Sequence, residues 1–184
     1  MDSGRGQNDE EKNMNIILMG VPGSGKTTQA ELLAKDLNLP HIETGAVYRS
    51  IANEPTVLGQ KVKNILATGD LIDDETTFKV VDKYLNEIKN GFILDGFPRT
   101  LIQAQRELFF IDKVFYIKLT DEEATKRLLL RARAGETPEI IKERLRVYHQ
   151  ETEPILNYYR RQKKLLEIDG SGTIEEVHDL IKNS

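Results

Sequence analysis

The strongest constraint on the fold is the segment Gly-Val-Pro-Gly-Ser-Gly-Lys-Thr at residues 20–27. It follows the apolar run Ile16–Met19, which is typical of a buried strand. An amphipathic pattern through Leu37 follows it and predicts a helix. A strand, a glycine-rich loop ending in Lys-Thr and a helix, in this order, form a phosphate-binding loop. We therefore expect an α/β fold built around a phosphate site.

The chemistry of the loop explains its spacing. Gly20, Gly23 and Gly25 allow backbone conformations in which successive N–H groups point at a phosphate. Lys26 adds a mobile positive charge for the outer phosphates, and Thr27 offers a hydroxyl to Mg²⁺. The helix that begins near Gly25 turns its positive end toward the same anion. A glycine-rich turn without a ligand is the alternative, and the flanking strand and helix argue against it.

Further short apolar runs at 91–94, 113–117 and 165–168 predict buried strands. Helical patterns separate these runs, which favours a parallel sheet with helices on both faces. The stretch between the apolar run at 16–19 and the run at 91–94 has a helical pattern, with breaks at 53–55 and 68–70. Because it is too long for a simple crossover, we expect it to form a small helical insertion beside the sheet.

Helix boundaries are also predicted in the last third of the chain. Thr120 resembles the first residue of a capping box and starts a helix that runs to about Ala134. The pattern then breaks, and Thr137 can cap a new helix in which Pro138 takes the first position. We expect this helix to run on to about Gln162.

Composition limits the compartment and the partners. The chain has 184 residues, a formal net charge of −4 and no cysteine. That length suits one α/β domain at 14–184, preceded by a disordered extension at 1–13 that lacks the apolar core of a signal peptide. No apolar run approaches the roughly 20 residues of a membrane-spanning helix, and no global basic field attracts nucleic acid. We expect a cytoplasmic protein that binds neither membranes nor nucleic acid and holds no zinc.

A second polar group, Asp95-Gly-Phe-Pro-Arg99, follows the predicted strand at 91–94. Ligands of open α/β sheets bind at the carboxyl ends of the strands, so Asp95 and Arg99 should lie beside the phosphate loop. Asp95 is suited to hold Mg²⁺ through water, and Arg99 to bridge phosphates with its forked donors. An ordinary turn would account for Gly96 and Pro98 but not for the two charges.

With these motifs, the chain resembles the adenylate kinase family of nucleoside monophosphate kinases, from Asn15 to about Lys182. The matching blocks follow the family's order: residues 20–29, 43–49, 69–73, 91–100 with Gln103, and 144–150 with Glu153-Pro154 and Tyr158-Tyr159. The resemblance implies reversible transfer of a phosphoryl group from Mg-ATP to AMP, which gives two ADP.

The resemblance also implies a P-loop NTPase-type three-layer fold with a parallel five-stranded sheet. Its core would comprise 14–43 and 74–184, its helical insertion for the monophosphate about 44–73, and its minimal lid about 132–138. A monomer is expected, and a homo-oligomer in which a neighbouring subunit covers the site stays open.

On the acceptor side, the resemblance assigns residues by matching position. The matched residues are Thr44, Gly45, Arg49, Ile72, Gly96, Arg99 and Gln103. Thr44 would contact the adenine, and Gln103 would read its edge. Arg49 and Arg99 would hold the AMP phosphate, while the backbone around Ile72 would line the pocket. The peptide bond before Pro98 is expected to be cis.

On the donor side, the matched residues are Gly23, Ser24, Gly25, Lys26, Thr27, Thr28, Arg127, Arg133 and Gly172. Arg127 would lie over the ATP adenine, and Gly172 belongs to a turn that would contact it. Arg133 aligns with the lid arginine.

The catalytic set implied by the resemblance is Lys26, Asp95, Arg99, Arg131 and Arg144. Thr27 and Asp95 would hold Mg²⁺, largely through water. The migrating phosphoryl group carries charge on its outer oxygens, so the enzyme has to position and neutralise it. The AMP phosphate is already ionised, and no general base is needed.

Two features depart from the family pattern. The family's lid commonly contains Gly-Arg-x-Asp-Asp, whereas the very short interval 132–138 has Gly135 and Glu136 at the aspartate positions. Because lids exclude water, we expect weak discrimination among donor bases, a reduced rate or some ATP hydrolysis. Ala46 stands where relatives usually carry Asp, which shifts the ordering of water around Mg²⁺ to Asp95 and Thr27.

Other functions stay open. Residues 45–49 also resemble bacterial cytidylate kinases, which keeps a UMP/CMP kinase as an alternative, although Thr44 with Gln103 favours adenine. A catalytically weak adenylate-sensing module is a second alternative, and arginines converging from separate elements argue against it. A small kinase for a sugar or a shikimate-like acid is a third, and the set Thr44, Arg49 and Gln103 argues against that.

Overall fold

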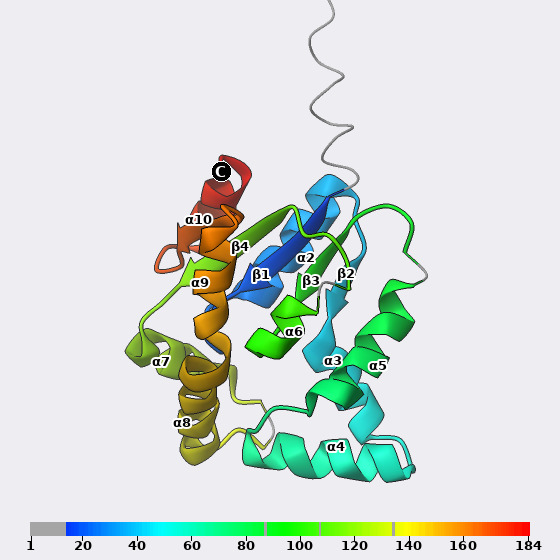
Figure 1. Cartoon of the computed structure of the whole chain (residues 1–184). Helices are drawn as coiled ribbons and strands as arrows, with labels where there is room; N and C mark the ends of the chain where they lie inside the picture. The colour runs from blue at the N-terminus through cyan, green and yellow to red at the C-terminus, as the bar shows by residue number, and fades with distance from the viewer. Residues whose placement is uncertain (1–13, 87, 107, 134) are drawn as a thin grey trace, which may run out of the picture.

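The computed structural model describes residues 14–86, 88–106, 108–133 and 135–184. The extension expected at 1–13 lies outside the described residues. Five strands form one parallel sheet: β1 Asn15–Met19, β2 His41–Glu43, β3 Phe92–Asp95, β4 Lys113–Lys118 and β5 Leu165–Asp169. Their order across the sheet is β2-β3-β1-β4-β5, and Figure 1 labels the first four of these strands. The expected five-stranded parallel sheet is confirmed, but the apolar runs did not locate β2, because it contains a single apolar residue.

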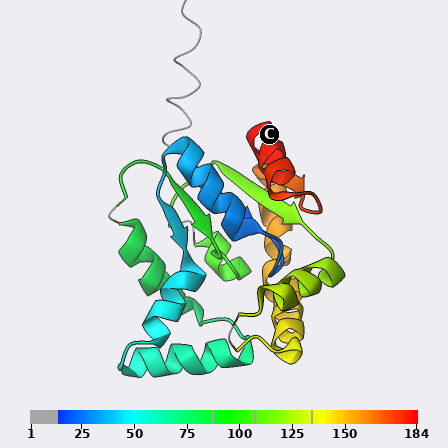
Figure 2. The same cartoon turned by 180° about the vertical axis from the view of Figure 1, so that it is seen from behind.

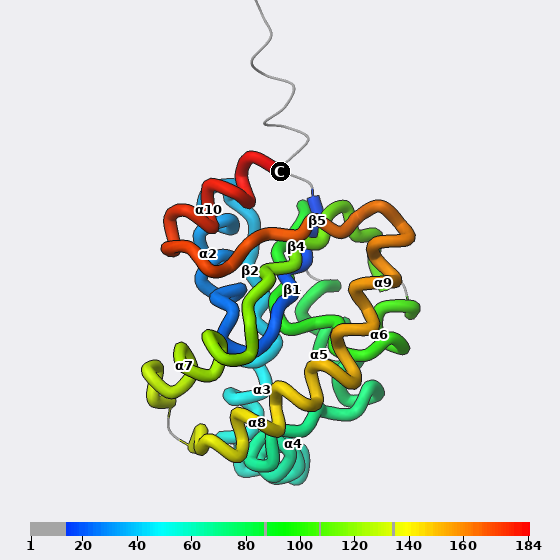
Figure 3. Tube along the Cα trace, turned by 90° about the vertical axis from the view of Figure 1, so that its left-hand side faces the viewer, coloured from blue at the N-terminus to red at the C-terminus, as the bar shows by residue number. Residues whose placement is uncertain are grey.

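Side chains that alternate along β1 divide the core into two layers. Ile17 and Met19 pack with α5 (Asp74–Leu85), α6 (Leu101–Gln105) and α9 (Pro154–Arg161). Ile16 and Leu18 pack on the other face with α2 (Lys26–Leu37) and α10 (Ile174–Lys182). Figure 2 shows α2 crossing the rear face, and Figure 3 shows the sheet between the two helical layers. The expected three-layer fold is therefore confirmed.

The helical stretch between β2 and β3 contains α3 (Thr44–Ala52), α4 (Val57–Thr68) and then α5. Both predicted breaks are confirmed: Thr56 caps α4, and Gly69 ends it with a φ of 85°. Tyr48, Val62 and Ile72 form a small buried cluster there, separate from the main core. As a result α3 and α4 stand as a unit beyond the carboxyl ends of the strands (Figure 1).

The helices after β4 begin where the sequence predicts and end differently. Thr120 caps α7 (Asp121–Arg131), which ends before Ala134 because Ala132 turns left-handed at φ 47°. Thr137 caps α8 (Pro138–Val147), as predicted.

The prediction of one continuous helix to about Gln162 is wrong, because a π-helical turn, Tyr148–Thr152, separates α8 from α9. Pro154 cannot donate a backbone hydrogen bond to the preceding turn, so the regular ladder is interrupted there. The hydroxyl of Thr152 donates to the carbonyl oxygen of Arg99 at 2.8 Å. This irregular turn therefore reaches the segment that follows β3.

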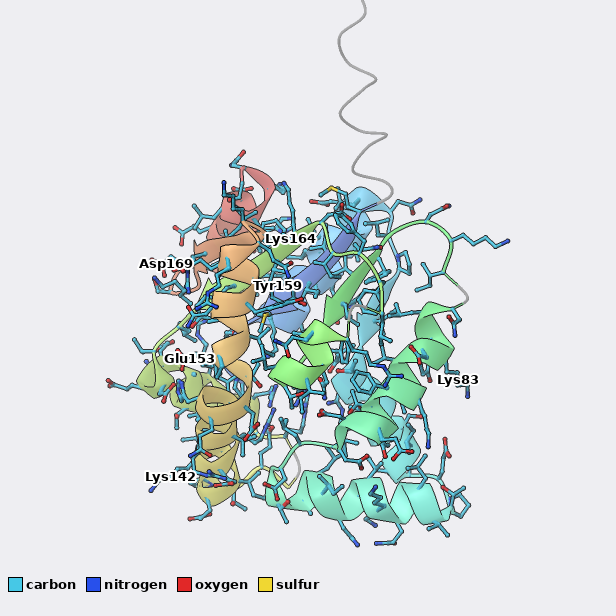
Figure 4. The ribbon with its side chains drawn as sticks, in the orientation of Figure 1. Lys83, Lys142, Glu153, Tyr159, Lys164 and Asp169 are labelled. Atoms are coloured by element: carbon cyan, nitrogen blue, oxygen red, sulfur yellow. The ribbon has the colours of Figure 1, made fainter. Side chains whose placement is uncertain are left out.

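Figure 4 shows how side chains on the helices divide between core and surface. Tyr159 lies on the side of α9 that faces the sheet and is buried, whereas Lys142 of α8 and Lys83 of α5 are exposed. In the described ranges, every helix is too short or too polar to cross a membrane.

Candidate active site

The phosphate loop connects β1 to α2, and its glycines have specific tasks. Gly23 and Gly25 adopt φ values of 89° and 88°, in the left-handed region that favours glycine. A Cβ atom at Gly23 would lie 2.7 Å from the carbonyl oxygen of Ala124, whereas one at Gly25 would meet no atom within 4 Å. No described side chain caps the start of α2, so its first N–H groups remain available to an anion.

A carboxylate lies beside this loop at the end of β3. Asp95 is only 1% exposed, and its Oδ2 atom accepts a hydrogen bond from the hydroxyl of Thr27. Its Oδ1 atom is buried and has no hydrogen-bond partner among the described residues. An unpaired buried carboxylate oxygen is unfavourable, and the water shell of Mg²⁺ would satisfy it. Thr27 and Asp95 therefore fit the magnesium site that the sequence predicts.

Two adjoining cavities open at this edge of the sheet. The larger, of about 710 Å³, reaches from the phosphate loop into the space beside α3 and α4. The smaller, of about 200 Å³, lies over the phosphate loop and reaches α7. Both are lined by Lys26, Arg49, Arg99, Arg133 and Arg144. The two cavities therefore share a group of cations contributed by separate elements.

One cavity-lining residue that the sequence did not single out as part of the site is Glu136, whose side chain is 8% exposed. Arg131 donates to its two carboxylate oxygens at 2.7 and 2.6 Å, and Arg144 donates to Oε1 as well. Partial burial raises the pKa of Glu136, but the Arg131 hydrogen bond and the Arg144 charge outweigh this and hold the pKa below its ordinary value. The sequence signal was an acid in the connector between two arginine-bearing helices.

Comparison with known proteins decides the family. The sequence pattern of adenylate kinases matches residues 18–164. The adenylate kinase of Mycobacteroides abscessus is 44% identical over 173 residues, which cover 89% of this chain and 94% of that protein. The adenylate kinase of Mycolicibacterium paratuberculosis is 43% identical with the same coverage. That of Oenococcus oeni is 38% identical over 179 residues, 91% of this chain and 95% of its own.

The chain belongs to the adenylate kinase family. It is thus a nucleoside monophosphate kinase, and the phosphate loop and arginine group described above stand in the setting of that family. A UMP/CMP kinase and a binding module without transfer are not favoured.

Most of the residues predicted for this kinase line the two cavities. The larger cavity is lined by Gly45, Arg49, Ile72, Gly96, Arg99 and Gln103. The smaller is lined by Gly23, Gly25, Lys26, Thr27, Thr28, Asp95, Arg99, Arg127, Arg131, Arg133 and Arg144. The peptide bond between Phe97 and Pro98 is cis, as expected.

Ser24, Thr44 and Gly172 lie outside these two linings. Ser24 is buried, and the hydroxyl of Thr44 donates to the carbonyl oxygen of Asp95 at 3.2 Å. Gly172 precedes α10, where a Cβ atom would lie 2.8 Å from a carboxylate oxygen of Glu176.

Two hydrogen bonds to neighbouring residues hold the side-chain amide of Gln103 in one orientation. Its Oε1 atom accepts the N–H of Arg99 at 2.7 Å, and its Nε2 atom donates to Asp74 Oδ1 at 2.8 Å. The hydroxyl of Thr100 donates to the same Asp74 oxygen at 2.9 Å. Because one amide hydrogen of Nε2 is still unused by these bonds, Gln103 can present a fixed donor to a ligand in the larger cavity.

The charge of Lys26 predicts a pH dependence. Burial lowers the pKa of Lys26 to about 8, against the opposing effect of Asp95, while Arg99, Arg144 and Arg131 lower it further. Lys26 is therefore charged below about pH 8 and neutral above it. Since kcat/KM reports on the free enzyme, kcat/KM for ATP should fall as the pH rises through about 8.

The measurement is a series of initial rates at AMP well below saturation, so that the free enzyme is observed, from about pH 6 to about pH 10, the range that brackets this group. Lys26→Arg is the comparison variant. Its guanidinium stays charged throughout this range, so the fall in kcat/KM at high pH should disappear. If the arginine variant showed the same fall in kcat/KM, the fall would have to come from the titration of another group.

Proposed function

We propose that the protein transfers the γ-phosphoryl group of Mg-ATP to AMP and forms two ADP, reversibly. The observation that carries this proposal is the junction of the two cavities at Lys26, Arg49, Arg99, Arg133 and Arg144. The triphosphate of the donor and the single phosphate of the acceptor would meet there, among cations from separate elements. Such positioning and charge neutralisation are what phosphoryl transfer requires.

The proposal assigns one nucleotide to each cavity. AMP would occupy the larger one, with the helical insertion at 44–73 enclosing it and with Arg49 and Arg99 on its phosphate. ATP would bind over the phosphate loop, with Arg127 on its adenine and Arg133 contributed by the lid segment 132–138. Arg131 and Arg144 would surround the migrating group.

Magnesium is the proposed cofactor. When bound, it would neutralise charge on the donor phosphates, and Thr27 and Asp95 are the residues that would hold its water shell. The hydroxyl contact between these two residues and the unpaired buried oxygen of Asp95 support the assignment. We also propose that the protein works in the cytoplasm, because a cysteine-free composition suits a reducing compartment. A monomer is proposed because one chain supplies the lining of both cavities.

A coupled assay of ADP formation tests the function directly. Mg-ATP would be supplied with AMP, CMP, UMP or GMP in turn, and a reaction without acceptor would measure hydrolysis. AMP should give the fastest turnover; faster turnover with CMP or UMP would overturn the proposed acceptor.

A second prediction concerns the donor. Because the lid segment is short, we expect GTP and CTP also to serve as donors when they replace ATP in this assay. Donors that are about a hundredfold poorer than ATP would contradict that part of the proposal.

The variant Gln103→Leu should reduce the preference for AMP over CMP and UMP, because the fixed donor at the base is lost. It should also lower the melting temperature, since Asp74 and the Arg99 N–H each lose a partner. The ratio of kcat/KM for AMP to that for CMP measures the effect. An unchanged ratio in a folded variant would show that the base is selected elsewhere.

A further inference from the structure

Besides Glu136, a second carboxylate pairs with the cation group: Glu43, which lies beside Arg49 and lines the smaller cavity. It ends β2, in register with Asp95 at the end of β3. Its side chain is 24% exposed, and Arg49 Nη2 donates to Glu43 Oε1 at 2.7 Å. Together with Glu136, which Arg131 and Arg144 hold, it gives each side of the cation group an internal anion.

Glu43 lies close to both arginines that are assigned to the acceptor phosphate. A Cβ atom at Gly45 would lie 3.1 Å from Arg49 Nη1, 3.3 Å from Glu43 Oε1 and 3.9 Å from Arg99 Nη2. One carboxylate oxygen and two guanidinium groups thus surround a single point. These guanidinium groups are the ones assigned to the acceptor phosphate, and all three side chains line the smaller cavity.

A carboxylate and a phosphate monoester are alternative partners for the same guanidinium donors. Arg49 Nη2 has to release its hydrogen bond to Glu43 before that N–H group can bind a phosphate. We infer that Glu43 is an internal substitute for the acceptor phosphate, which holds Arg49 in the empty site and is displaced when a nucleoside monophosphate binds. This inference rests on the proposed function, because it takes Arg49 and Arg99 as the acceptor-phosphate ligands.

As a consequence, Glu43 should lower the affinity for the nucleoside monophosphate below the value that the arginines alone would give. Breaking the Glu43–Arg49 pair offsets part of the gain from the phosphate, and the displaced carboxylate then repels that phosphate. The effect must be specific to the phosphate, because the proposal gives Glu43 no contact with the base. Removal of the carboxylate charge should therefore tighten binding of the monophosphate and leave binding of its nucleoside unchanged.

The test is calorimetric titration of the full chain, without donor nucleotide, with AMP and separately with adenosine. In Glu43→Gln, the dissociation constant of AMP should fall by about fivefold, the effect of about one partly exposed ion pair. The dissociation constant of adenosine should stay the same. Glu43→Ser provides a second variant, and circular dichroism checks that both fold.

Glu75→Gln is the matched control. Glu75 also forms an ion pair, in which its Oε1 atom accepts a hydrogen bond from Lys79 at 2.7 Å, but it is exposed and lines neither cavity. Glu75→Gln removes the same charge, and AMP affinity should change less than twofold, which is the scatter expected for a screened charge.

Three results would overturn the inference: AMP affinity that is unchanged or weaker in both folded Glu43 variants, an equal gain for adenosine, or an equal gain in Glu75→Gln. The proposed function is judged separately, by AMP-dependent ADP formation in the unaltered chain. If that assay selects CMP or UMP instead, the titration is run with that monophosphate and its nucleoside, so the two ideas fail independently.

Discussion

Replacement of Lys26 by alanine should lower the turnover of phosphoryl transfer by at least about a hundredfold, the usual cost of losing a charge that stabilises the transition state. Lys26 lines both cavities, so it stands where the donor and acceptor phosphates are proposed to meet. The fold should survive, because the burial that lowers the pKa of Lys26 also makes its charge unfavourable in the folded protein. The coupled assay gives kcat, and circular dichroism reports the fold.

Lys35→Ala is the matched control for this variant. Lys35 lies in the last turn of the same helix α2, is exposed and is remote from both cavities. It should retain turnover close to that of the unaltered chain. If Lys26→Ala turned over as fast as Lys35→Ala, the phosphate loop would not have the role assigned to it.

The second large effect is expected for Arg99, and Arg99→Ala should also reduce turnover by at least about a hundredfold. Burial lowers the pKa of Arg99, partly balanced by the negative charge of Asp95, and its Nε atom donates to the carbonyl oxygen of Gly96 at 2.7 Å. The guanidinium is therefore held in a fixed orientation between the two cavities. Both kcat and KM for AMP should change, because the arginine would bind the acceptor phosphate before and during transfer.

Arg99→Lys separates charge from shape. Lysine keeps the charge but lacks the forked donors, so this variant should recover only part of the lost turnover. Arg160→Ala serves as the control, since Arg160 is a half-exposed surface residue that pairs with Glu167. Full activity in a folded Arg99→Ala variant would remove Arg99 from the proposed site.

The parts of the fold that the sequence predicted well are those determined by local chemistry. The run from Ile16 through Leu37 joins a strand, a phosphate loop and a helix, and each has a residue pattern that neighbouring segments reinforce. Thr120 and Thr137 were equally clear as helix starts, because capping depends on residues only three positions apart. β2 escaped detection because three residues with one apolar side chain carry no period.

The pairing of charged side chains could not be predicted in the same way. In the sequence Glu136 was a departure from the family's lid pattern and Glu43 was only the first residue of a matching block, yet each is hydrogen-bonded to an arginine of the cation group. Which acid meets which arginine depends on where separate elements place their side chains, and local pattern holds no such information. The contact of Gln103 with Asp74 joins residues 29 positions apart and was unforeseen for the same reason.

The π-helical turn at Tyr148–Thr152 has a consequence for how this chain can vary. Arg144 lies on the helix before the turn, and Thr152 at its end holds the Arg99 carbonyl oxygen. A π-helical turn holds about one residue more than an α-helical turn, so a one-residue deletion there could restore a regular helix while α8 and α9 kept nearly the same relative orientation. The carbonyl oxygen of Arg99 would keep its partner only if Thr152 itself were retained. In evolutionary terms, this turn is a place where the length of the chain could change by one residue without a repacking of α9 on the sheet.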